Sequence, residues 1–169
     1  MSDTFESRNI GDVYAGEAKK NTARQLFAIG EAGIYPAYAV RVTTTHTLVL
    51  AKDSDKHFAG IAMCMPGHDL DTVYTYSATL NSTEKISIYG VQDDVDVWVF
   101  YVAQSPAADI VFGDILVLSA TDGMFMLFAY ANGTDITDVP SISGYVKVVD
   151  EHVSGSTTAN QLVKVHLGG

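Results

Sequence analysis

The sequence predicts an all-β protein, a mainly antiparallel β-sandwich or β-barrel (the β-tulip included) with an extended N-terminal arm. After Gly33 the apolar residues recur in short runs with a period of two, and polar turns separate the runs. A hydrophobic content of 47% against 18% charged residues is typical of a folded chain with one core. We therefore divide the 169 residues into an N-terminal arm over 1–30 and a single β domain over 31–169.

The arm has few apolar residues, and its only helical spacing is that of Ala23, Leu26 and Phe27. Acidic and basic residues balance over 1–24, so the rest of the chain carries the whole net charge of −10. Such a segment gains too little from packing on itself to offset its ordering entropy. We expect it to become ordered on the surface of a partner protein, through the apolar side chains of Phe5, Ile10, Val13 and Tyr14. The alternative is a packed N-terminal strand of the body.

About ten candidate strands follow, each a short apolar run bounded by glycine or polar residues. They cover residues 38–42, 47–51, 58–63, 73–79, 84–90, 95–103, 114–119, 124–131, 142–149 and 161–167. An Asp122-Gly123 pair separates the apolar runs 114–119 and 124–131. An Asp-Gly pair between two apolar runs predicts a β-hairpin.

The strands between residues 95 and 131 are apolar on both faces, whereas an ordinary antiparallel strand alternates buried and exposed positions. The protein's own second sheet can cover one face. The other face favours a neighbouring subunit, because a monomer rarely exposes a large aromatic patch. We therefore expect a homo-oligomer whose contact includes four side chains: Trp98, Phe100, Met126 and Phe128.

Composition and motifs exclude several classes of function. The acidic balance argues against a nucleic-acid partner, no apolar run is long enough to cross a bilayer, and no secretory signal opens the sequence. The five histidines lack metal-ligand spacing, and no nucleophile elbow or phosphate-binding glycine loop is present. We expect no enzyme, no cofactor and no metal requirement. Two minor alternatives stay open, a calcium ion in an acidic turn and a copper(I) site at Met63, Cys64 and Met65.

Four short pieces of the chain resemble a known family. They are YPAYAV at 35–40, AGIA at 59–62, GDILV at 113–117 and LVKVHL at 162–167. This pattern is similar to that of the small capsid decoration, or cement, proteins of tailed viruses, including the lambda head decoration protein family. The chain departs from it by an aromatic-rich stretch over 73–90 and by the strand that contains Trp98.

The resemblance implies a structural virion protein, commonly a trimer. Such a protein would be made in the host cytoplasm, bind the outer surface of an icosahedral capsid and clamp neighbouring subunits of the major capsid protein. Two other classes share the β architecture. A viral fibre or receptor-binding β module would expose aromatic and polar residues on loops to hold a ligand. A small-molecule-binding β-barrel would instead place Trp98, Phe100 and Phe128 around a cavity.

Overall fold

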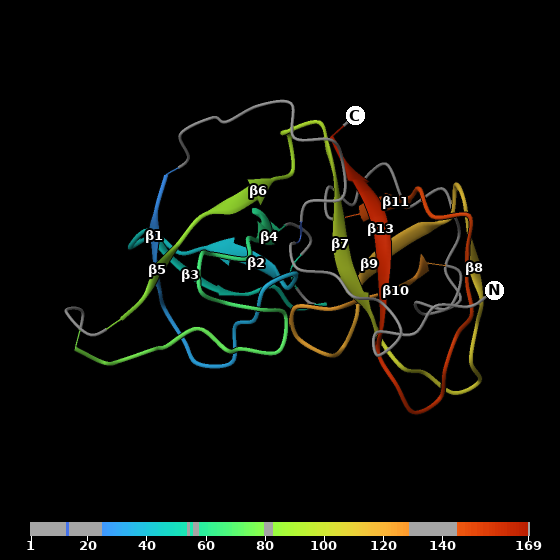
Figure 1. Cartoon of the computed structure of the whole chain (residues 1–169), viewed down its shortest axis with the longest axis horizontal. Helices are drawn as coiled ribbons and strands as arrows, with labels where there is room; N and C mark the ends of the chain where they lie inside the picture. Colours follow the sequence, from blue (N-terminus) through green and yellow to red (C-terminus); the bar gives the residue numbers. More distant parts are fainter. Residues whose placement is uncertain are drawn as a thin grey trace.

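The computed structural model describes residues 13, 25–53, 55, 58–79, 83–128 and 145–168. This part of the chain is all β, as predicted, and contains no α-helix. Its strands form a six-stranded sheet, a closed five-stranded barrel and a two-stranded sheet. Figure 1 shows the six-stranded sheet and the barrel side by side along the long axis of the molecule. Within the described residues, no helix is long and apolar enough to cross a membrane.

The six-stranded sheet has the order β5-β1-β3-β2-β4-β6 and is antiparallel except between β1 and β3. Its strands are β1 (Phe27–Ile29), β2 (Ala39–Val42), β3 (Thr47–Leu50), β4 (Gly60–Ala62), β5 (Lys85–Ile86) and β6 (Ile88–Gly90). The last residues of the expected arm thus form β1 rather than the end of a helix. Ile29 is fully buried between the two neighbours of β1, which explains why this segment joins the body.

The six-stranded sheet curls until its two edges meet. Its edge strands β5 and β6 follow each other in the chain with only Ser87 between them. One face of the curled sheet surrounds a core of its own, which includes Val40, Leu48 and Ile86. The single strand that we expected over 84–90 is therefore two short strands, because its halves pair with opposite edges of one sheet.

The closed barrel has the order β10-β7-β13-β11-β9, with β9 paired to β10. Its strands are β7 (Val95–Tyr101), β9 (Ile115–Leu118), β10 (Phe125–Leu127), β11 (Tyr145–Val148) and β13 (Gln161–Leu167). The two-stranded sheet pairs β8 (Ile110–Val111) with β12 (His152–Val153). Strands β7 and β13 pair along their full lengths and form the longest paired part of the barrel wall.

Side chains of β7 alternate between the barrel core and its outer wall. Val97, Val99 and Tyr101 are buried to at least 99% and point inward, as the period of two requires. Trp98 and Phe100 occupy the outward positions. Both faces of the strand are therefore apolar, and its outward face must find another cover.

The stretch 73–79 does not form the predicted strand. The N–H of Tyr74 donates to the carbonyl of Ile34 over 2.9 Å, and the carbonyl of Thr75 accepts from the N–H of Glu84 over 3.0 Å. These two bonds reach different parts of the chain and do not continue into a ladder along one partner. The ring of Tyr74 is buried in the core of the curled sheet.

The predicted hairpin between β9 and β10 is confirmed, and its turn joins the barrel to the six-stranded sheet. Gly123 donates its N–H to the carbonyl of Ala51 and accepts the N–H of Ala39, each over 2.8 Å. Asp122 adds an ion pair of 3.5 Å with Lys52. Because Ala39 and Ala51 share the main core cluster with the barrel residues, one apolar core extends across this junction.

Replacing Gly123 by alanine should destabilise the protein by roughly 2–5 kcal/mol, since a left-handed backbone costs about 1–2 kcal/mol and overpacking about 1–3 kcal/mol. The φ angle of Gly123 is +78°, and a Cβ would lie 2.7 Å from Cδ2 of Tyr38. Gly67→Ala is the matched control, because its φ is +85° but a Cβ there meets nothing within 4 Å. Urea unfolding should show a clearly larger loss for Gly123→Ala, and equal losses would contradict tight docking.

Candidate functional site

The four residues predicted to form an oligomer contact lie in two groups on the barrel. Phe100 belongs to the main core and Trp98 packs against it, whereas Met126 and Phe128 belong to a separate outer cluster. Phe100 and Phe128 are only 7% and 5% exposed, while Trp98 and Met126 are half-buried. Two of the four side chains thus leave little surface for a partner in the chain as described.

Residues of the same chain cover the outward face of β7. The ring of Phe100 meets that of Tyr38, from the six-stranded sheet, edge-on at a centroid distance of 5.4 Å. The ammonium of Lys164 lies 5.9 Å from the centre of the Trp98 ring, a cation–π distance. The aromatic character that we attributed to a subunit interface therefore serves, at Phe100, the contact between sheet and barrel.

Of the four predicted arm residues, only Val13 lies among the described residues. It is fully buried in the main core cluster, and its carbonyl accepts the N–H of Trp98 over 2.8 Å. At Val13 the arm therefore packs against the body. Phe5, Ile10 and Tyr14 lie outside the described residues.

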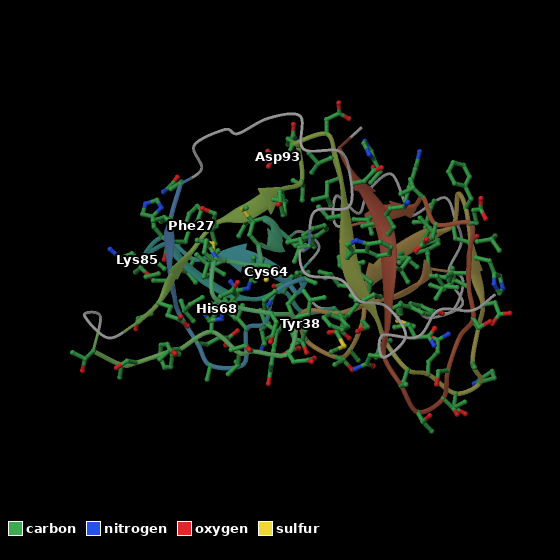
Figure 2. All side chains as sticks on the ribbon, viewed as in Figure 1. Phe27, Tyr38, Cys64, His68, Lys85 and Asp93 are labelled. Carbon is green, nitrogen blue, oxygen red and sulfur yellow. The ribbon has the colours of Figure 1, made fainter. Side chains whose placement is uncertain are left out.

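A hollow of about 360 Å³, partly open to solvent, lies where the six-stranded sheet meets the barrel. Figure 2 shows Tyr38 in this position, between the two parts of the molecule. Tyr35, Tyr38 and Phe100 supply aromatic walls, and Leu70 and Met124 add apolar surface. Its volume falls at the lower end of the range of small-ligand sites, about 300–1,000 Å³.

The chain places two tyrosines in this hollow by a tight turn. The N–H of Tyr38 donates to the carbonyl of Tyr35 over 3.3 Å, with Pro36 and Ala37 between them. Ala37 has a φ of +69°, which is unfavourable for alanine, but it is fully buried and its N–H donates to Ala62. The turn brings the two tyrosine rings to a centroid distance of 5.3 Å. Burial, and secondarily the neighbouring Tyr35, raises the pKa of the Tyr38 phenol.

Two polar side chains, Asp71 and Asn160, complete the lining of the hollow. The side-chain oxygen of Asn160 accepts the N–H of Ala103 over 2.9 Å, which fixes the amide and leaves its NH₂ group as a donor. The Asp71 side chain is exposed, and its carboxylate accepts no hydrogen bond from the described part of the chain. No local sequence pattern indicates this site, because its residues come from segments as far apart as Tyr35 and Asn160.

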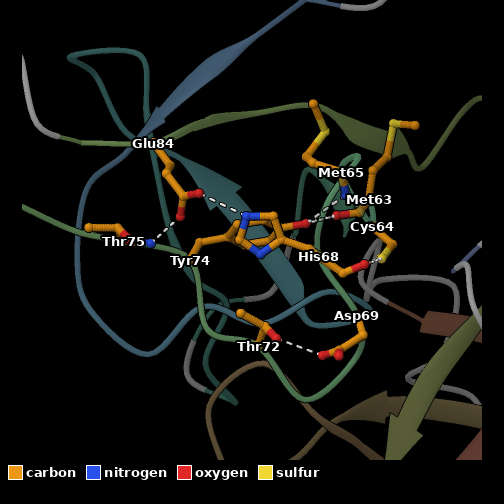
Figure 3. Close-up of polar contacts among 9 residues, drawn as sticks. All are labelled: Met63, Cys64, Met65, His68, Asp69, Thr72, Tyr74, Thr75 and Glu84. Carbon is orange, nitrogen blue, oxygen red and sulfur yellow. Dashed lines mark hydrogen bonds and ion pairs between the residues drawn. The ribbon is translucent and has the colours of Figure 1, made fainter.

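A second polar cluster surrounds His68, as Figure 3 shows. His68 Nε2 lies 2.8 Å from Glu84 Oε1, and its ring packs against that of Tyr74 at 4.6 Å. The Tyr74 hydroxyl donates to the carbonyl of Met63 and accepts the N–H of Met65. Partial burial by itself raises the pKa of Glu84, but hydrogen bonds from the Thr75 N–H and from His68 outweigh it and lower that pKa. The cluster ties the loop after β4 to the start of β5.

Met63, Cys64 and Met65, which the sequence analysis gave as an alternative copper(I) site, lie beside this cluster. The Cys64 thiol donates to the carbonyl of His68 over 3.3 Å. Met65 packs in the core of the curled sheet, whereas Met63 and Cys64 border the main core. Among the described residues, no group of three or more His, Cys, Asp or Glu side chains is placed to hold a metal ion.

His166 bridges two carboxylates on the outer wall of the barrel. Its Nδ1 lies 2.7 Å from Asp96 and its Nε2 lies 3.0 Å from Asp94. The hydrogen bond with Asp96 raises the pKa of His166, and Asp94 adds to this, although partial burial opposes both. The arrangement favours a charged imidazolium and serves stability.

No model of a known protein family matches the chain, and no curated protein is significantly similar to it. The resemblance to capsid decoration proteins therefore stays a prediction from the four short sequence pieces.

We expect His166→Gln to destabilise the protein below about pH 6.5 and to have less effect at pH 9. A raised folded-state pKa stabilises the fold fully below the unfolded pKa, and this contribution disappears as the pH rises through the folded pKa. The loss at low pH should be at most about 1 kcal/mol, because the side chain is 34% exposed. Urea unfolding at pH 5.5 and pH 9 measures it.

His46→Gln is the control for this prediction. His46 is exposed and has no ion pair within the described part of the chain, so its replacement should not depend on pH in this way. An equal loss of stability at both pH values for His166→Gln would show that the carboxylate bridge does not stabilise the fold.

Proposed function

We propose that this chain is a structural virion protein that binds the outer surface of an icosahedral capsid and clamps neighbouring subunits of the major capsid protein. Its resemblance to the decoration proteins of tailed viruses supports this, as does an all-β body that carries the net charge of −10. An acidic body suits a protein that stays soluble and faces solvent on a particle. The proposed working form is a homo-oligomer, with a trimer favoured by the resemblance.

The observation that carries the proposal is an exposed apolar tip at the end of β8. Phe112 is 70% exposed and Val111 is 45% exposed. Figure 1 shows β8 on the side of the barrel away from the six-stranded sheet, so that sheet does not cover this tip. Aromatic side chains in such positions commonly anchor protein–protein contacts.

The tip is held rigidly, which favours a docking role over a chance exposure. Asp114 donates its N–H to the carbonyl of Val111 over 3.1 Å, and its carboxylate accepts the N–H of Val111 over 2.9 Å. Gly113, with a φ of +91°, completes the turn and donates to the carbonyl of Val148. A preorganised anchor loses little conformational entropy when it binds. The GDILV piece of the family resemblance begins in this turn.

The outer cluster on β9 and β10 is the proposed contact between copies of the chain. It consists of Ile115, Val117, Met126 and Phe128. Ile115 and Met126 remain partly exposed, and Trp98 is likewise half-buried on the same barrel. Apolar side chains on an outer barrel wall suit a subunit interface, whose centre is depleted in charge. Val13 is buried in the main core and therefore not available to a partner. The proposal keeps the other three expected arm contacts, Phe5, Ile10 and Tyr14.

Replacing Phe112 by serine should weaken capsid binding by about 30-fold or more, since losing a central aromatic anchor costs about 2 kcal/mol or more. Co-sedimentation with purified shells of the parent virus measures this. Tyr76→Ser is the control, because this aromatic residue is 42% exposed but lies in a different part of the fold. Wild-type protein that never sediments with shells would reject the capsid role, whereas full binding by Phe112→Ser would reject only the tip as its anchor.

Introducing lysine at Met126 or Trp98 should shift the protein toward monomers, because a buried charge without a partner opposes association. Sedimentation-velocity ultracentrifugation gives the oligomeric mass, and circular dichroism checks that each variant folds. Val73→Lys introduces the same charge at an exposed position outside the barrel and should leave the mass unchanged. Folded variants at both positions with unchanged mass would place the contact elsewhere.

A further inference from the structure

We infer that the hollow between the turn at 35–38 and the barrel is a binding site for a neutral saccharide. This inference goes beyond capsid attachment and does not depend on it, because the apolar tip at Phe112 and the hollow share no residue. It rests on the aromatic walls of the hollow, on the hydrogen-bonding capacity of its polar groups that the described part of the chain leaves unused, and on the charge around them.

The aromatic walls form a concave surface rather than a flat slot. The rings of Tyr35 and Tyr38 are tilted by 39°, and those of Tyr38 and Phe100 by 76°. The non-parallel rings cannot sandwich a planar base, but they can enclose the puckered C–H face of a sugar ring. Tyrosine suits this task because it supplies a large apolar surface together with a hydroxyl group.

The polar groups of the hollow match a ligand that carries many hydroxyls. The Asp71 carboxylate is an acceptor without a hydrogen-bond donor in the described part of the chain. The side-chain oxygen of Asn160 accepts the N–H of Ala103, and its NH₂ group is left as a donor for a ligand. The hydroxyls of Tyr35 and Tyr38 act as either donor or acceptor. A few fixed polar groups on an apolar lining are the usual composition of a small-ligand site.

The site is built in advance of any ligand. Tyr38 packs against the backbone of Gly123, and the turn that carries both tyrosines is fixed by the buried Ala37. Asn160 is held through its bond to the end of β7. Little ordering is therefore required when a ligand binds, which favours measurable affinity for a small molecule.

Charge restricts the class of saccharide. Asp71 lies in the lining and Asp69 is close to it in the chain, whereas none of the described Lys or Arg residues lines the hollow. The whole chain carries a net charge of −10. Sialic and uronic acids are anionic and would meet like charge there, so the site should prefer neutral hexoses and N-acetylhexosamines.

The test is a titration of the full-length protein with short oligosaccharides of glucose, galactose, mannose and N-acetylglucosamine, with N-acetylneuraminic acid as an anionic comparison. Saturation-transfer NMR detects binding, and chemical-shift titration gives the dissociation constant. At least one neutral saccharide should bind with a dissociation constant in the millimolar range or tighter. No binding by any neutral saccharide, or preferential binding of the acidic sugar, would overturn the inference.

Two variants of the hollow locate the binding, each with a matched control. Tyr35→Ala and Asp71→Asn should each weaken it by at least about tenfold, as expected when an aromatic or hydrogen-bonding contact is lost. Tyr76→Ala and Asp53→Asn alter exposed residues of the same types outside the hollow and should bind as the wild type does. Asp71 is exposed, so Asp71→Asn should fold normally.

Unchanged affinity in both hollow variants, or an equal loss in the controls, would show that any saccharide binds elsewhere. Phe112→Ser distinguishes saccharide binding from capsid binding. It should keep full saccharide binding, so failure of one proposal leaves the other open to its own test.

Discussion

The structure depends on the docking of one hairpin turn into a neighbouring sheet. Gly123 exchanges backbone hydrogen bonds with Ala39 and Ala51, and the absence of a side chain allows Tyr38 to pack directly against it. This contact joins a curled sheet and a closed barrel around one apolar core. It also sets the position of Tyr38, which in turn covers Phe100 and forms a wall of the hollow.

Both the barrel and the six-stranded sheet are curved so that their edge strands come together. The barrel closes through the pairing of β9 with β10, and the six-stranded sheet brings its edges together at Ser87. Closed or nearly closed sheets leave few unpaired backbone groups, and such groups would otherwise promote edge-to-edge aggregation. Their outer walls can then be used for contacts. One wall of the barrel faces the curled sheet, and another carries the outer cluster.

The paired strands β7 and β13 show how one surface passes from solvent to core. Cross-strand neighbours on their outward face are Asp96 with His166, Trp98 with Lys164, and Phe100 with Leu162. The first pair is a charged hydrogen bond, the second a cation–π contact, and the third a buried apolar contact. Each pair suits its depth, because charges keep their hydration at the exposed end and apolar groups lose theirs at the buried end.

The sequence by itself determined the features that depend only on residues close together in the chain. The period of two located the final strand with the bounds that the structure shows, and Asp122-Gly123 predicted the hairpin turn. Strands β1, β8 and β12 escaped prediction because two or three residues are too few to show a period.

Only the tertiary structure decided what covers each apolar face. Nothing near Phe100 in the chain indicates that Tyr38 covers it, and nothing near Tyr35 indicates that Asn160 shares its hollow. Local patterns reveal that a face is apolar. Which distant segment, or which other molecule, buries it depends on how the whole chain closes upon itself.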